Sequence, residues 1–466
     1  MFPMKLAVIG GGGMRVPAFV RAILHGRPAL FGEICLLEPD TVRRETIARL
    51  AVELAGALGH PGTVHATADA EEAFSGADFV FSAIRVGGDR GRVIDEEVAL
   101  RRGLVGQETT GPGGCAMALR TIPVVLSYCE ALARLAPGAV LINFTNPAGL
   151  ITQAISLHAR VRAVGVCDTP SGTIGCLARF LGADASVTGF RYGGLNHLGW
   201  ITSVTTGGEE RIGELLARYE ELQRFDHRFA IFDPALVRRV GAIPTEYVYY
   251  FYDPKRYVDA VARAGASRGQ DVLRLNEELL TGVAKAFAAG DVHDAWAAYS
   301  ALMGIRHDTY MRADADGDSG QARARASRAA AGPGRLDDAR LGGYEGIALR
   351  VIEGLTSRHP GTVIVNTPGG GALGFLDADD VAEVPAFVHG GGVAPLACGE
   401  LPRSARALIT QVKEYERGIV SAAVSGDAGL AALALAQHPL VPGVTAAREL
   451  MDEYRERHGP HLAYLR

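Results

Sequence analysis

Long hydrophobic runs, an excess of positive charge and regularly spaced cysteines are all missing from this sequence. No uninterrupted apolar run reaches the roughly 18 residues that would indicate a membrane helix, and the formal net charge of -5 is not the basic signature of nucleic-acid binding. The 6 cysteines are scattered, which is typical of a chain in a reducing cytoplasm. The start, MFPMKLAVIGGGG, predicts a strand and a glycine turn instead of a signal peptide. We therefore expect a cytoplasmic protein without nucleic-acid or membrane partners.

What is present is the composition of an ordinary globular protein, with 48% hydrophobic and 21% charged residues. Short apolar segments alternate with helical patterns in the first third, at 5–10, 33–38, 79–84 and 139–145, which predicts a parallel α/β sheet. Later segments are richer in helical periodicity. We therefore expect a Rossmann-like domain with a mostly parallel sheet over residues 1–195. A mixed α+β, helix-rich domain should follow over 196–466, and the whole should resemble lactate and malate dehydrogenases.

A glycine-rich turn follows the first predicted strand. Gly10, Gly11, Gly12 and Gly13 stand between that strand and a helical segment, where glycine lets the backbone approach a pyrophosphate at the positive end of the helix. Glu38 follows the second strand, and its carboxylate suits a ribose hydroxyl, which favours NAD over NADP. The neighbouring Asp40 is an alternative. Arg15 stands where the usual pattern has its third glycine, so a simple tight turn is the competing interpretation.

Two further pairs carry the side chains of a candidate metal site. Cys167 and Asp168 end an apolar strand, and the carboxyl ends of parallel strands are where α/β folds build sites. Asn196 and His197 lie in a glycine-flanked segment, GGLNHLGW. A thiolate with an imidazole suits a borderline divalent ion and leaves coordination positions open for substrate oxygens. Either residue alone would more often be structural.

Tyrosine, arginine and asparagine side chains supply the remaining candidates. The segment IPTEYVYYFYD contains Tyr247, which could act as a base beside a metal-bound substrate or belong to an aromatic core helix. Arg85 and Arg268 carry guanidinium groups that suit a phosphate or carboxylate, although an exposed arginine is usually just surface. Asn143 and Asn146 follow a strand in NFTNPAG, where an amide could bind a sugar or the nicotinamide ribose, or simply mark a turn.

Taken together and in order along the chain, these segments resemble glycoside hydrolase family 4. The resemblance runs through VIGGGG, SAIRVGG, GQETTGPGG, NFTNPAG, GVCDTP, GLNHLGW, IPTEYVYYFYD, GGYEGIAL, VKEYERGIVSAAVSGD and ALAQHPLVP. The RVGG, GQETTGPGG and NHLGW segments are most similar to the 6-phospho-β-glucosidase branch. The stretch at 313–335, rich in Ala, Arg, Gly and Asp, fits the family poorly and reads as a mobile surface loop.

The resemblance implies a role for each candidate. Cys167 and His197 match the manganese ligands of the family, and Tyr247 matches its base. Asp168 matches a position proposed as an acid in some members, while others lack a carboxylate there. The substrate contacts that the resemblance implies are Arg85, Asn146 and Arg268, with Arg268 facing a 6-phosphate.

The resemblance also implies a mechanism that differs from the usual pair of carboxylates. NAD+ oxidises the sugar at C3, Tyr247 removes the acidified C2 proton, the C1 group leaves, water adds and the hydride returns to C3, with Mn2+ stabilising the charge. The substrate would be a phosphorylated glucoside and the enzyme a homodimer or homotetramer. The alternatives are another family 4 activity (α-glucosidase, α-galactosidase or glucuronidase), a plain sugar or hydroxy-acid dehydrogenase that releases NADH, and a non-catalytic NAD-binding sensor.

Overall fold

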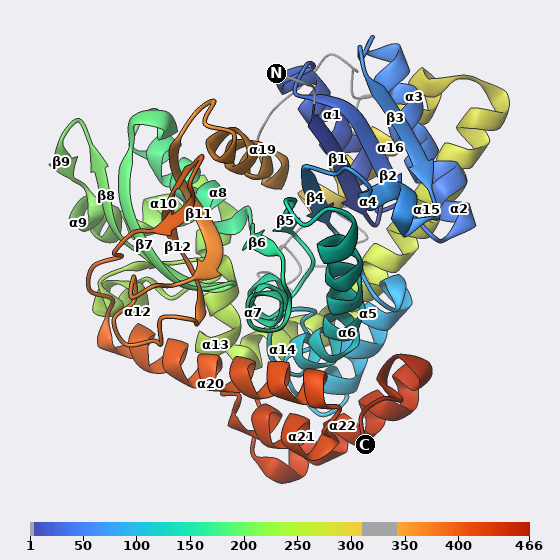
Figure 1. Ribbon diagram of the computed structural model, residues 1–466. Helices are drawn as coiled ribbons and strands as arrows, with labels where there is room; N and C mark the ends of the chain where they lie inside the picture. The colour runs from blue at the N-terminus through green and yellow to red at the C-terminus, as the bar shows by residue number, and fades with distance from the viewer. Residues whose placement is uncertain (1–3, 310–342) are drawn as a thin grey trace.

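The computed structural model describes residues 4–309 and 343–466 (Figure 1). The mobile loop expected at 313–335 lies outside these residues. One sheet runs through the described part of the chain, with the strand order β10-β8-β7-β12-β11-β6-β5-β4-β1-β2-β3, while β13 pairs with β12 and β9 pairs with β8. The strands are β1 (Met4–Ile9), β2 (Phe31–Leu37), β3 (Thr63–Thr67), β4 (Phe79–Ser82), β5 (Val140–Asn143), β6 (Arg162–Gly165), β7 (Gly189–Leu195), β8 (Leu198–Thr206), β9 (Glu209–Glu210), β10 (Ile243–Pro244), β11 (Gly361–Pro368), β12 (Val381–His389) and β13 (Gly392–Pro395).

The N-terminal half of the sheet is parallel, as the alternating pattern predicts. Its order, β3-β2-β1-β4-β5-β6, is the strand order of dinucleotide-binding Rossmann folds. Successive residues of β1 point to opposite faces, so Leu6 and Val8 enter one core while Ala7 and Ile9 enter the other. Each face of the sheet therefore packs against a different set of helices. Because both faces are buried, such a sheet needs strands with nearly continuous apolar runs.

Helices cover both faces of this half. The first face packs on α1 (Val16–Gly26), α3 (Arg49–Ala57) and α19 (Tyr344–Leu355), and the second on α4 (Ala70–Phe74), α6 (Gly111–Leu135) and α7 (Ala148–His158). The helical segment between β2 and β3 is built from α2 (Thr41–Arg43), a π-helical turn η1 (Arg44–Ala48) and α3. Asp40 begins it by accepting a hydrogen bond from the Arg43 amide, so this neighbour of Glu38 is a helix cap.

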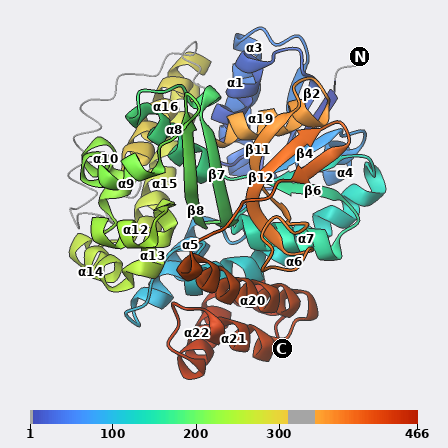
Figure 2. The same cartoon turned by 90° about the vertical axis from the view of Figure 1, so that its left-hand side faces the viewer.

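The second half of the sheet is antiparallel and is surrounded by the helix-rich part of the chain (Figure 2). Figure 1 shows α20, α21 and α22 together below α6 and α7, and α20 packs against both α6 and α7. The division at residue 195 stays a prediction. The remaining helices are α5 (Gly88–Leu100), α8 (Thr169–Phe180), η2 (Ala185–Val187), α9 (Ile212–Ala217), α10 (Tyr219–Phe225), α11 (His227–Ala230), α12 (Pro234–Val240), η3 (Glu246–Val248), α13 (Tyr249–Tyr252), α14 (Pro254–Ala264), α15 (Arg268–Ala289), α16 (Val292–Asp308), α20 (Arg403–Ser425), α21 (Ala428–Gln437), α22 (Val444–His458) and η4 (Gly459–Leu462).

The apolar character of α6 belongs to the protein core. Among the described residues, α6 is the one helix whose length and composition would allow it to cross a membrane. Of its most apolar stretch, however, 61% is buried inside the protein. All six cysteines are buried and free. Packing in the protein core accounts for the apolar surface of α6 and for the burial of the cysteines.

Candidate active site

The glycine turn between β1 and α1 is closely packed against β2. The amides of Gly10 and Gly11 both donate to the Leu37 carbonyl, at 3.0 and 2.9 Å, and Gly10 has a φ of 84°. A Cβ on Gly11 would lie 2.6 Å from the Leu36 Cβ, and one on Gly12 would lie 2.8 Å from the Glu38 Cγ. The turn therefore requires glycine for close approach, and the structure explains at least these positions without a ligand.

The start of α1 completes the predicted turn. The Gly13 amide donates to the Gly10 carbonyl at 2.8 Å. Arg15 occupies the N-cap position of α1, and its side chain makes no capping hydrogen bond to the first amides of the helix. Glu38 is only 8% exposed and accepts from the amides of Gly12 (3.0 Å) and Asp40 (3.1 Å). Its carboxylate thus holds the turn in shape at the place where the sequence predicts a ribose contact.

Asn143 at the end of β5 uses its amide inside the protein. Its Nδ2 donates to the carbonyls of Thr145 and Ala148 and to the Thr152 hydroxyl, and its Oδ1 accepts from the Thr145 amide. The side chain is fully buried. This geometry makes Asn143 the support of the loop that carries the partly exposed Asn146, and its direct contact with a cofactor stays a prediction.

Cys167 and Asp168 follow β6, as the sequence predicts. Cys167 is 5% exposed, and burial, followed by the negative charges of Glu383 and Asp168, raises the pKa of its thiol well above the usual value. A thiolate at this position therefore requires a cation beside it. Asp168 stands at the N-cap position of α8 without a side-chain capping hydrogen bond, and it lies 4.0 Å from a guanidinium nitrogen of Arg15, with both side chains more than two-fifths exposed.

His197 occupies the turn between β7 and β8 in an orientation fixed from two sides. Its φ is 63°, and its ring stacks on Tyr247 with centroids 3.7 Å apart and planes 4° apart. Its Nδ1 lies 2.7 Å from the Thr109 hydroxyl, which itself donates to the side-chain oxygen Oε1 of Gln107 at 2.8 Å. Since the hydroxyl proton is thus committed, Thr109 accepts from Nδ1–H. The tautomer that results leaves Nε2 free to bind a metal ion.

The donor chemistry of this pair fits a divalent ion. Burial lowers the pKa of His197 to about 4, so the imidazole is neutral near pH 7, as a metal ligand must be. Across residues 4–309 and 343–466, no group of three or more His, Cys, Asp or Glu side chains is placed to hold a metal. One sulfur and one nitrogen donor would leave the other coordination positions to a substrate.

Tyr247 lies in η3 and is 8% exposed, so the short helix presents it to the His197 ring instead of burying it completely. The following Tyr249 and Tyr250 are buried in the core. The two interpretations of this aromatic segment therefore apply to different members: Tyr249 and Tyr250 form core, while Tyr247 faces a candidate metal ligand.

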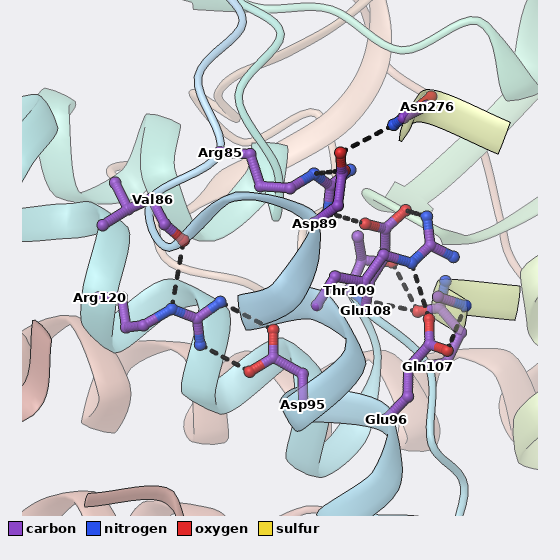
Figure 3. Close-up of polar contacts among 12 residues, drawn as sticks. Arg85, Val86, Asp89, Asp95, Glu96, Gln107, Glu108, Thr109, Arg120 and Asn276 are labelled. Atoms are coloured by element: carbon purple, nitrogen blue, oxygen red, sulfur yellow. Dashed lines mark hydrogen bonds and ion pairs between the residues drawn. The ribbon is translucent and has the colours of Figure 1, made fainter. Parts of the chain in front are cut away.

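Arginines and carboxylates from α5, the residues just before it and the loop that precedes α6 form a compact network (Figure 3). Glu108 is paired with both Arg85 and Arg92, the latter at 2.9 Å, and these two guanidinium groups outweigh burial and hold the pKa of Glu108 well below its usual value. Asp89 accepts from Asn276 Nδ2 at 2.8 Å and lies 3.7 Å from the Arg85 Nε. Of these residues the sequence predicted only Arg85, which precedes α5; Arg92 within α5 and Glu108 were not predicted.

Arg268, at the start of α15, lies against the end of α16. It donates to the Thr309 hydroxyl at 2.9 Å and to the Arg306 carbonyl at 2.7 Å. Burial and the like charges of Arg15, Arg268, Arg85 and Arg92 lower the pKa of Arg306 to about 9. Arg306 thus lies near four other arginines, of which Arg85 and Arg92 are paired with Glu108. Arg15, Arg92 and Arg306 were not among the predicted substrate contacts.

A parallel sheet in Rossmann order, with a glycine turn between β1 and α1, defines an α/β protein of the dinucleotide-binding class. Residues 5–183 match the family 4 glycosyl hydrolases, and residues 192–441 match the C-terminal domain of the same family. The chain therefore belongs to glycosyl hydrolase family 4, as its motifs predict.

Proteins similar to this chain over nearly its whole length carry phosphoglycosidase names. A probable 6-phospho-beta-glucosidase of Bacillus subtilis is 29% identical, with 98% of this chain and 97% of the relative covered. A 6-phospho-alpha-glucosidase of Lacticaseibacillus paracasei is 26% identical, with 96% of each covered. The solved structure of the 6-phospho-beta glucosidase from Thermotoga maritima with manganese, NAD+ and glucose-6-phosphate has a TM-score of 0.77 at 26% identity and covers 98% of each chain.

Proposed function

We propose that this family 4 enzyme is an NAD+- and Mn2+-dependent 6-phospho-β-glucosidase that acts on phosphorylated β-glucosides in the reducing cytoplasm. The observation that carries the proposal is the Thr109–His197–Tyr247 arrangement, in which one hydroxyl fixes a metal-binding tautomer and the predicted base stacks on the same ring. The family membership and the names of the similar β-glucosidases support it.

The residues divide the proposed work among three groups. Gly10 to Gly13 and Glu38 form the dinucleotide turn, and Cys167 and His197 would hold the manganese ion. When bound, NAD+ supplies reversible hydride transfer at C3 and Mn2+ supplies Lewis-acid stabilisation of negative charge.

The remaining side chains would handle the substrate. Tyr247 would remove the C2 proton. Because its ring stacks on that of His197, Tyr247 lies beside the proposed metal site. Asp168, half-exposed beside Arg15, could protonate the leaving group. Arg85, Asn146 and Arg268 would bind the sugar phosphate, and the arginine-rich surroundings of Arg306 support a doubly charged ligand there.

The test is a screen of nitrophenyl glucosides, phosphorylated and unphosphorylated and of both anomers, with NAD+ and Mn2+. We expect hydrolysis only of the phosphorylated β-glucoside, without NADH accumulation. Preference for the α-anomer would assign the activity of the L. paracasei relative. NADH accumulating in proportion to substrate consumed would instead indicate a dehydrogenase, and NAD+ binding without turnover of any sugar would indicate a sensor. A homodimer or homotetramer is proposed for the active form, and its size in solution can be measured by light scattering.

A further inference from the structure

A buried carboxylate on β12 lies between the strands that lead to the two predicted metal ligands. Glu383 is 1% exposed and accepts three hydrogen bonds, from the Tyr192 hydroxyl at 2.5 Å and from the Nδ2 atoms of Asn196 and Asn366, each at 3.1 Å. Three donors and no arginine or lysine surround it in these contacts. Burial outweighs these hydrogen bonds and raises the pKa of Glu383 to about 7, because no side-chain ion pair among these contacts offsets its charge.

The register of the sheet places Glu383 between the strands that lead to the two ligands. Gly165, Asn366, Glu383 and Gly194 stand side by side on β6, β11, β12 and β7. Cys167 comes two residues after Gly165 and His197 three residues after Gly194. The row thus joins the strand that ends at Cys167 to the hairpin that carries His197.

Glycines keep this row free of competing side chains. A Cβ on Gly165 would lie 2.4 Å from the Thr152 hydroxyl and 2.8 Å from the Asn366 Cβ, and one on Gly199 would lie 2.0 Å from the Tyr192 hydroxyl oxygen. A side chain at either position would displace a residue that hydrogen-bonds to Glu383, which is Asn366 beside Gly165 and Tyr192 beside Gly199. Asn366 Oδ1 has no hydrogen-bond partner within the described residues although it is buried, and an orphaned buried acceptor calls for a donor, a water or an ion nearby.

We infer that Glu383 is the positioning residue of the metal site. Through Asn196 it fixes the residue next to His197, and through Asn366 it is joined to β11, which pairs with the strand that leads to Cys167. A divalent ion bound by one thiolate and one neutral imidazole retains a positive charge, and the Glu383 carboxylate stabilises it from outside the coordination shell. The inference rests on the proposed Cys167–His197 site and adds to it a residue that touches neither metal nor substrate. Partners of this kind orient metal ligands and tune their affinity.

The test measures Mn2+ binding directly, by the electron paramagnetic resonance signal of free Mn2+ in titrations without substrate. Glu383→Gln removes the charge but keeps the shape, and its Mn2+ affinity should fall by about 10- to 100-fold, the usual cost of such a partner. Glu383→Asp should recover part of the affinity. Glu353→Gln is the matched control, because Glu353 is a buried carboxylate on α19 paired with Arg27, and it should bind Mn2+ like the wild type. Substitution with Co2+ adds a second readout, since its sulfur-to-metal absorption band should weaken in Glu383→Gln.

The outcomes separate the inference from the proposed function. If the wild type binds Mn2+ and Glu383→Gln binds it equally well with an unchanged Co2+ band, the inference is overturned while the proposed function stands. If the wild type itself binds no Mn2+, the proposed function fails first. NAD+ binding reports whether each variant folds. If Glu383→Gln does not fold, Asn196→Ala serves as the test, because it removes the hydrogen bond between Glu383 and the neighbour of His197 while keeping the carboxylate. Weaker Mn2+ binding by Asn196→Ala would support the inference, and wild-type affinity would overturn it.

Discussion

Replacing Thr109 by valine tests the geometry of the metal site with a minimal change in shape. Valine keeps the branched side chain but has no oxygen to accept the Nδ1–H of His197, whose distance to the Thr109 hydroxyl is 2.7 Å. Leaving a buried donor unpaired costs about 1–3 kcal/mol. If that cost falls on the metal-binding tautomer, Mn2+ affinity should fall by about 5- to 150-fold, at about 1.4 kcal/mol for each factor of ten.

The measurement is a Mn2+ titration of the wild type, Thr109→Val and Thr109→Ser, followed by electron paramagnetic resonance. Serine retains the hydroxyl and should bind close to the wild type. Thr110→Val is a control from the neighbouring position, because the Thr110 side chain makes no capping hydrogen bond at the start of α6. Wild-type affinity in Thr109→Val would refute the reasoning that this hydroxyl selects the tautomer of His197.

Three further results are expected. Arg268→Ala should reduce kcat/KM for phosphorylated substrate by orders of magnitude, at about 2–5 kcal/mol for truncating one partner of a buried charge pair, and an equal rate on substrate with and without phosphate would contradict this. Tyr247→Phe should still bind NAD+ but lose about 10²–10⁴-fold in kcat, and a near-normal rate would move the base to another residue. Burial lowers the pKa of His438 from its ordinary value of 6.5 to about 3, so the unfolded chain binds this proton more readily. The unfolding free energy should therefore fall as the pH decreases from 6.5 towards 3, and His438→Gln should show a smaller decrease in Tm over that range; an equal decrease would contradict this.

The sequence predicted those features that depend on residues close together in the chain. Alternating apolar segments determine the parallel strands, because a strand buried on both faces has few options for its side chains. The glycine turn could be located because Gly10 follows a strand directly. Cys167 and His197 could be chosen because both stand in short segments with family-specific neighbours, but nothing in either segment contains the hydroxyl of Thr109 that orients the imidazole.

Residues that act through the fold could not be found in this way. Glu383 lies in VAEVPAF, which reads as an ordinary strand, and its importance arises only when β12 is placed beside β7 and β11. Arg306 becomes part of the arginine cluster only when α16 ends against Arg268. For Asn143 the sequence predicted a contact with a ligand because the residue stands at the end of a strand. In the fold its side-chain amide forms hydrogen bonds that hold the following loop.

The central claim is elimination through C2, and the most direct measurement is the isotope content of the product. Hydrolysis of the phosphorylated β-glucoside in D2O, analysed by proton NMR, should give glucose 6-phosphate with deuterium at C2 and none at C3, while NADH does not accumulate. Direct displacement at C1 never breaks the C2–H bond. A product that keeps a fully protiated C2 after many turnovers in D2O would contradict the proposed exchange of the C2 proton with solvent by Tyr247.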